Sequence, residues 1–288
     1  MLLKSKIFVK SSILLIFSGF LVSCSSSPEP IPSAYISHVF DYVYSPGQDA
    51  LLATKADTAN FIGVPSIDKG YLHLGGFGGY VIAGFDHNVL NAEDADFEIF
   101  CMRGAWPEPG VVYVMSDTNG DGKPNDTWYE IKGNQYKNSI RNYWVRYYKA
   151  EDDSTNISWR DSKGNQGQLV PGKGFRYSAR WWWHPTKPDS ITFYGTRLPD
   201  AFDKNANGAW TVPIPRFTKG YAKNVFGSDY DSALGANSFD ISDAVDSLGK
   251  AVNLPHIRFI KVQTGVFQQA GWLNAVSTDL MGAKDLKK

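Results

Sequence analysis

The sequence predicts an all-β protein folded as a β-sandwich with few short helices. Three observations support this: aromatic residues make up 14% of the chain, glycines number 27, and short apolar runs alternate with Gly, Asn and Asp clusters. Aromatic and β-branched residues favour strands, whereas Gly, Asn and Asp favour the turns between them. Regular spacing of such runs is typical of a sandwich or barrel.

The predicted strands follow one another along the chain with turn residues between them. Val111–Ser116 is apolar on both faces, which favours a central strand, and Tyr143–Tyr148 contains the charged Arg146, which favours one wetter face. The predicted strands are Tyr35–Tyr44, Tyr71–Leu74, Tyr80–Phe85, Phe97–Met102, Val111–Ser116, Thr127–Lys132, Tyr143–Tyr148, Asn156–Trp159, Ser190–Tyr194 and Ile257–Thr264.

Helical signals are scarce. Ala50–Ala59 has the composition of one short helix. Ser242–Ser247 could form a single turn, with Asp240 or Ser242 as the N-cap, because short oxygen-bearing side chains satisfy the free N–H groups of a first turn.

The first residues have the features of a secretory leader. Three lysines precede the apolar run Ile13–Val22, which is too short to span a membrane. The run ends in Leu-Val-Ser-Cys, which resembles the lipobox of bacterial lipoproteins, where the cysteine is acylated. We therefore expect a signal peptide at 1–23, lipidated Cys24 and a flexible tether at 24–34, and one β-sandwich domain at 35–285. The alternatives are an ordinary signal peptide cut near Ser27, or an uncleaved anchor.

Charge and cysteine content exclude several classes of protein. The 29 basic residues balance 29 acidic ones, and loss of the leader lysines would leave the chain slightly acidic. Without a basic stripe, a nucleic-acid partner is not expected. With Cys24 carrying lipid, Cys101 has no partner for an intrachain disulfide and is expected in the core. The sequence contains no H-E-x-x-H, G-x-S-x-G or C-x-x-C motif.

The segment Asp117–Asp126 has the D-x-N-x-D-G spacing of a calcium-binding loop. Trp128 stands where such a loop has a bidentate Glu, so we expect weak, structural Ca²⁺ binding, unless the segment is only a hairpin turn. Asp203–Gly208 has similar spacing with one carboxylate fewer and is expected to be a plain turn. The predicted calcium ligands are Asp117, Asn119, Asp121, the Lys123 carbonyl and Asp126.

Tryptophans clustered near loops predict a ligand-binding surface. In a strand, Trp181 and Trp183 would share one face, and an exposed indole face suits sugar rings, corrin-like macrocycles or apolar peptides. Burial of all three consecutive tryptophans in the core is the alternative. The predicted ligand-binding residues are Trp181, Trp183, His184, Trp106 and Trp210.

Four segments resemble a group of secreted lipoproteins of Bacteroidota described only as cell surface proteins. They are GGFGGYVIAGFDHNVLNAEDADFEIF at Gly75–Phe100, EPGVVYVMSDTNGDGKPNDTWYEIKG at Glu108–Gly133, SFDISDAVDSLGKAVNLPHIRFIKVQTGV at Ser238–Val266 and GWLNAVSTDL at Gly271–Leu280. Their order also resembles galactose-binding-like (discoidin-like) jelly rolls. That resemblance implies a jelly-roll sandwich, a structural calcium and ligand binding by loops at one end. The resemblance to the lipoprotein group implies a TonB-dependent transporter as a partner.

Together these features predict an outer-membrane lipoprotein, at the cell surface or facing the periplasm, that touches the membrane through its lipid anchor alone. We expect it to bind a carbohydrate or a corrinoid for capture and uptake without transforming it. The alternatives are a glycan hydrolase or lyase using carboxylates such as Asp86, Asp94, Asp96 or Glu108, and a purely structural surface component.

Overall fold

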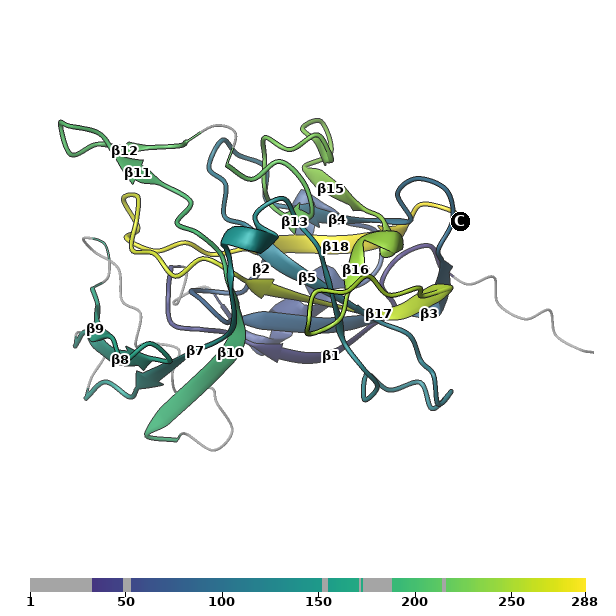
Figure 1. Ribbon diagram of the computed structural model, residues 1–288, viewed down its shortest axis with the longest axis horizontal. Helices are drawn as coiled ribbons and strands as arrows, with labels where there is room; N and C mark the ends of the chain where they lie inside the picture. Colours follow the sequence, from purple (N-terminus) through teal and green to yellow (C-terminus); the bar gives the residue numbers. More distant parts are fainter. Residues whose placement is uncertain (1–32, 49–52, 152–154, 171, 173–187, 214–215) are drawn as a thin grey trace, which may run out of the picture. The chain divides into compact units, whose positions relative to one another are not determined.

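The computed structural model describes residues 33–48, 53–151, 155–170, 172, 188–213 and 216–288 (Figure 1). All of them belong to one unit of the chain, residues 32–288. The strands are β1 His38–Val43, β2 Leu72–His73, β3 Tyr80–Leu90, β4 Phe97–Cys101, β5 Gly110–Met115, β6 Tyr129–Ile131, β7 Ile140–Tyr148, β8 Ile157–Asp161, β9 Gln166–Leu169, β10 Ser190–Arg197, β11 Asp203–Lys204, β12 Trp210–Thr211, β13 Tyr221–Ala222, β14 Tyr230–Asp231, β15 Ala236–Phe239, β16 Ala244–Val245, β17 His256–Thr264 and β18 Asp279–Asp285.

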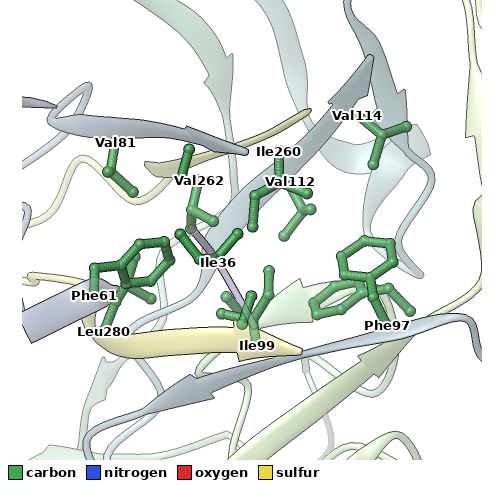
Figure 2. Packing of buried hydrophobic residues seen from close by; sticks show 14 of the residues in the cluster. Ile36, Phe61, Val81, Phe97, Ile99, Val112, Val114, Ile260, Val262 and Leu280 are labelled. Carbon is green, nitrogen blue, oxygen red and sulfur yellow. The ribbon is translucent and has the colours of Figure 1, made fainter. Parts of the chain in front are cut away.

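Two antiparallel sheets form a sandwich. The seven-stranded sheet has the order β1-β3-β17-β5-β6-β16, and β13 pairs with β5 beyond the end of β6; the five-stranded sheet has the order β14-β15-β4-β18-β2. Alternate residues of each strand point into the space between the sheets. Figure 2 shows Val112, Val114 and Ile260 of the larger sheet facing Phe97 and Ile99 of the smaller one. Close packing of these buried side chains is the main source of stability.

A third sheet, with the order β10-β7-β8-β9, packs around a separate aromatic core. Tyr143, Val145 and Tyr147 point to the same side of β7 and are fully buried. Phe77 packs on Tyr143, with ring centroids 5.3 Å apart. A third cluster of buried side chains, including Phe202 and Tyr221, lies beside β5 and carries the short hairpin β11–β12.

The helices are short 3-10 turns: η1 Lys55–Phe61, η2 Ile67–Lys69, η3 Tyr136–Asn138 and η5 Ile241–Asp243. The turn expected after residue 240 is present, and Asp240 is its N-cap, accepting a 2.7 Å bond from the N–H of Ser242. The helix expected at Ala50–Ala59 is displaced: η1 begins at Lys55, where Asp57 and Thr54 cap each other's backbone.

The all-β sandwich is confirmed, and each of the ten predicted strands overlaps an observed strand. The finer assignment to a jelly roll stays a prediction. Cys101 is buried on β4, as expected, and burial raises the pKa of its thiol to about 12.

Candidate functional site

Four aromatic rings wall a cavity of about 540 Å³, which we call the aromatic pocket. The rings are those of Trp106, Phe202, Trp210 and Trp272. The remaining lining residues are Gln48, Met102, Glu108, Ala270, Gly271, Leu273 and Ala275. This size and this mixture of aromatic walls with a few polar groups are typical of small-molecule sites.

Trp106 lies in the loop between β4 and β5, and 48% of its surface is exposed. Its ring packs at 5.2 Å on that of Phe202. Trp210 opens β12, and the side chain of Asn205 closes the β11–β12 turn by accepting the N–H groups of Asn207 and Ala209. The segment Asp203–Gly208, predicted to be a plain turn, therefore consists of strand β11 followed by a hairpin turn. The Lys204 ammonium lies 4.5 Å from the centre of the Trp210 ring.

The opposite wall comes from the loop between β17 and β18. Gln268 fixes this loop to Phe202: its Oε1 accepts the N–H groups of Ala201 and Phe202, and its Nε2 donates to the carbonyl of Phe202. Trp272 stands on the same loop and is 78% exposed. The loop can therefore present an indole without being loosely attached.

A buried charge network lies below the rings. Lys223 donates to Glu108 and lies 3.1 Å from Oδ2 of Asp279. Gln48 Nε2 donates to Glu108 at 2.7 Å, and His73 Nδ1 lies 2.9 Å from Asp279 Oδ1. Of these groups, Glu108 and Gln48 reach the pocket.

Two carboxylates share one ammonium in this network, and their pKa values move apart. Burial opposes ionisation of Asp279, but Lys223 and His73 hold its pKa at about 2. Burial raises the pKa of Glu108, although Lys223 works against it. Burial also disfavours the Lys223 ammonium, but the two carboxylates outweigh this and raise its pKa. The carboxyl at the pocket is therefore the one that more readily accepts a proton.

A second cavity, of about 430 Å³, adjoins the aromatic pocket and shares Ala275 with it. We call it the adjoining pocket. Trp159, Phe267 and Arg197 are among its lining residues, together with the amides of Gln268 and Asn274. The two cavities therefore meet at Ala275, on the loop that carries Trp272.

The predicted calcium loop follows β5. One oxygen of Asp117 accepts the N–H of Gly122 and pairs with Arg258 at 3.3 Å; the other, Oδ1, is buried without a hydrogen-bond partner. An orphaned buried carboxylate oxygen fits a cation ligand.

The other predicted ligands of the loop bond within it. Asn119 accepts from the N–H of Asp121, Asp121 from that of Lys123, and Asp126 from that of Thr118. Among the described residues, no three His, Cys, Asp or Glu side chains are grouped to hold a metal. Calcium therefore stays a prediction, supported by Asp117.

The other carboxylates considered for hydrolysis do not line the aromatic pocket. Asp96 is fully buried and accepts the N–H groups of Ala92 and Ile241. Asp86 lies 2.7 Å from His87, whose other ring nitrogen contacts Asp285. Asp94 occupies a turn with a φ of 61°.

Of the predicted binding residues, the structure brings Trp106 and Trp210 together in one cavity, although 104 positions separate them along the chain. Trp181, Trp183 and His184 lie outside the described residues. Phe202, Lys223 and Asp279 were not predicted as parts of a site. Trp272 follows Gly271, as Trp106 precedes Pro107, so the same sequence feature, a tryptophan beside a turn residue, could have identified it.

Comparison with protein-family models and with curated proteins finds no match to this chain. Within the described ranges, no helix is long and apolar enough to cross a membrane.

Proposed function

We propose that the chain is an outer-membrane lipoprotein, at the cell surface or facing the periplasm, whose β-sandwich binds a glycan in the aromatic pocket and does not transform it. The observation that carries this proposal is the convergence of Trp106, Trp210 and Phe202 around one open cavity with a carboxyl group at its base. Indole faces suit the C–H faces of sugar rings, and a carboxylate and an amide suit their hydroxyl groups.

Binding is favoured over hydrolysis because no second carboxylate joins Glu108 among the described residues that line the aromatic pocket. Asp279 lies next in the network, but its side chain is fully buried and held ionised by Lys223. Glycosidases of the common kind use two carboxyl groups that both face the sugar.

The adjoining pocket favours a ligand of several units over a single sugar. It combines the rings of Trp159 and Phe267 with the charged groups of Arg197, Asp161 and Asp200. A chain crossing the loop at Trp272 would meet both cavities. The lipid at Cys24, the calcium loop, the jelly-roll topology and delivery to a TonB-dependent transporter belong to the same proposal.

The test is a titration of the mature chain with a panel of soluble oligosaccharides, read by tryptophan fluorescence and calorimetry, with a corrinoid as a separate arm. Trp106→Ala should weaken glycan binding by about 30-fold, as loss of an aromatic anchor worth about 2 kcal/mol does. Its melting temperature should change little because Trp106 is half exposed.

Trp128→Ala is the matched control, since this indole lines a different cavity. It should bind the glycan as the unchanged chain does. Equal binding by the Trp106 and Trp128 variants would place the site elsewhere. If the chain bound the corrinoid and none of the oligosaccharides, the ligand would be a corrinoid and not a glycan, and the aromatic pocket would remain the proposed site.

A further inference from the structure

A cavity of about 490 Å³ lies over the face of the seven-stranded sheet that points away from the sandwich core; we call it the amine pocket. Its walls include Trp128, Trp144 and Tyr194, and the last is 64% exposed. Its lining also contains Lys261, Tyr113 and Glu130, which come from three neighbouring strands.

The strand register puts these three side chains in one row. Lys261 of β17 is directly opposite Tyr113 of β5, and Tyr113 is directly opposite Glu130 of β6. Directly opposed residues share a face of the sheet, so all three point to the same side. With strands about 4.8 Å apart, the Cα atoms of Lys261 and Glu130 are about 10 Å apart.

Strand β10 fixes two members of the row. The Thr196 hydroxyl donates to Oε2 of Glu130 at 2.6 Å, and the Thr196 N–H donates to the Tyr113 hydroxyl at 3.3 Å. The third member, Lys261, is held by rings: its ammonium lies 4.7 Å from the centre of Tyr80 and 5.3 Å from that of Tyr113.

Lys261 has no ion-pair partner among the described residues, in contrast to Lys223. Lys223 is more deeply buried than Lys261 and contacts two carboxylates. A structural lysine at a half-buried position would be expected to have such a partner, because an unpaired buried charge is costly. An amine held between rings at a cavity is instead typical of a reactive group.

The charged groups around the Lys261 amine leave it easy to deprotonate. Burial lowers the pKa of Lys261 to about 8, and Asp41 on β1 offsets this only in part. Glu130, Arg141 and Asp246 are the other charged groups of the cavity. A free amine is therefore available near neutral pH.

Glu130 supplies the complementary group. Burial raises the pKa of its carboxyl, although Thr196 and Arg141 work against this. A carboxyl that keeps a proton more readily can pass it to a departing oxygen.

We propose that the amine pocket is a second site, in which the amine of Lys261 condenses reversibly with an aldehyde that carries a flat ring. The nitrogen forms a bond to the carbonyl carbon, both amine protons end on the carbonyl oxygen, and that oxygen leaves as water. Glu130 carries a proton to this oxygen and regains one from the nitrogen. Addition of water reverses the step, so no oxidant or reductant is consumed.

The aromatic side chains that line the amine pocket favour an aldehyde that carries a flat ring. Trp128, Trp144 and Tyr194 can stack on a planar ligand, and the exposed guanidinium of Arg141 at the rim can meet an anionic substituent. Pyridoxal is a suitable probe because it is a planar aromatic aldehyde. Acetaldehyde is the control aldehyde, because it has no ring.

The experiment traps the condensed form in the purified full-length protein. Pyridoxal is added at pH 7.5 with cyanoborohydride, which reduces the C=N bond, and labelled peptides are quantified over time. Lys261 should be labelled roughly a hundredfold faster than Lys219, because the free-amine fraction of an exposed lysine is that much smaller. Lys219 is an internal control with a half-exposed side chain paired to Asp243.

Two variants complete the test. Lys261→Arg keeps the positive charge but has no amine, so the rapid labelling by pyridoxal at this position should disappear. Trp144→Ala should slow labelling by pyridoxal about tenfold while leaving labelling by acetaldehyde unchanged. Equal labelling of Lys261 and Lys219 in the unchanged chain would overturn the proposal. Trp106→Ala should label normally, so this site and the glycan site can fail separately.

Discussion

The Lys223 ammonium lies 3.1 Å from a carboxylate oxygen of Asp279, and at most 3% of either side chain is exposed. Lys223 follows β13, which pairs with the seven-stranded sheet, whereas Asp279 begins β18 of the five-stranded sheet. One ammonium therefore ties the two sheets together just below the aromatic pocket. Lys223 adopts a φ of 56°, and such left-handed backbone persists in a non-glycine residue only where its surroundings hold it.

Lys223→Met should destabilise the protein strongly. The change leaves Glu108 and Asp279 buried side by side with no ammonium between them and with His73 as the remaining partner of Asp279. Removal of one member of a buried pair costs about 3–5 kcal/mol. Urea unfolding at pH 7 measures it. Lys219→Met, which breaks an exposed pair with Asp243, should cost at most about 1 kcal/mol. Similar losses in the two variants would show that the buried network contributes no more than a surface pair.

Asp279 should make the protein sensitive to acid. Its folded pKa of about 2 lies below the ordinary value of 3.8, so its stabilisation is complete above about pH 5 and is lost as the pH falls towards 2. The loss should be about 2 kcal/mol. Glu108 acts in the opposite direction because its pKa is raised. Unfolding midpoints between pH 2 and pH 6 should fall more steeply for the unchanged chain than for Asp279→Asn. Parallel curves would contradict this.

The sequence was sufficient to predict the strands whose apolar side chains lie in the cores. Val111–Ser116 and Tyr143–Tyr148 are examples, because local alternation reflects burial directly. Strand β18, Asp279–Asp285, was not predicted. It contains two aspartates, a lysine and a glycine, and it is extended because β4 and β2 pair with it on either side. Such pairing is a tertiary effect that no local pattern contains.

The same distinction applies to the candidate site. Trp106 and Trp210 could be singled out as indoles near turns, but not as neighbours of each other. Trp106 packs on Phe202, and Gln268 of the β17–β18 loop is hydrogen-bonded to Phe202, so these neighbours are brought together by contacts between distant parts of the chain. The partners of Lys223 come from positions 115 and 56 residues away, so a single sequence gives no sign that this lysine is buried.

Calcium should stabilise the fold if the Asp117 loop binds it. The buried, unpartnered Oδ1 of Asp117 would gain a ligand, and a cation that binds only the native state stabilises it by about 2.7 kcal/mol at a hundredfold excess over Kd. EDTA should lower the melting temperature and added Ca²⁺ should restore it. Asp121→Ala should remove the response, whereas Asn207→Ala in the plain turn should keep it. A melting temperature unaffected by EDTA would contradict Ca²⁺ binding by the Asp117 loop.

Lipidation at Cys24 should decide where the protein is found. The basic leader and the Leu-Val-Ser-Cys ending predict an acylated cysteine at the mature N-terminus. Cys24→Ala should move the protein from the membrane fraction to the soluble fraction. Cys101→Ala is the control and should stay with membranes, because Cys101 is buried in the core. If the Cys24 variant remained in the membrane fraction, the anchor would lie elsewhere.

Lys261→Met should stabilise the protein at pH 7, the reverse of the effect at Lys223. Lys261 has no carboxylate partner within ion-pair distance in the described chain, and its depressed pKa of about 8 means that folding disfavours its charged form. The cost of charging it is at most about 3 kcal/mol. A methionine in the same place would keep contact with the rings of Tyr80 and Tyr113.

This gain should depend on pH in a defined direction. Between pH 8 and about pH 10.4 the unfolded chain binds a proton at this lysine that the folded chain has lost, so the stability of the unchanged protein rises and the advantage of the methionine variant shrinks. Urea unfolding at pH 7 and pH 10 measures both effects. Lys284→Met, at a lysine 3.9 Å from Glu98, should change little at either pH. If Lys261→Met were less stable than the unchanged chain at pH 7, the charged amine would stabilise the fold, contrary to this prediction.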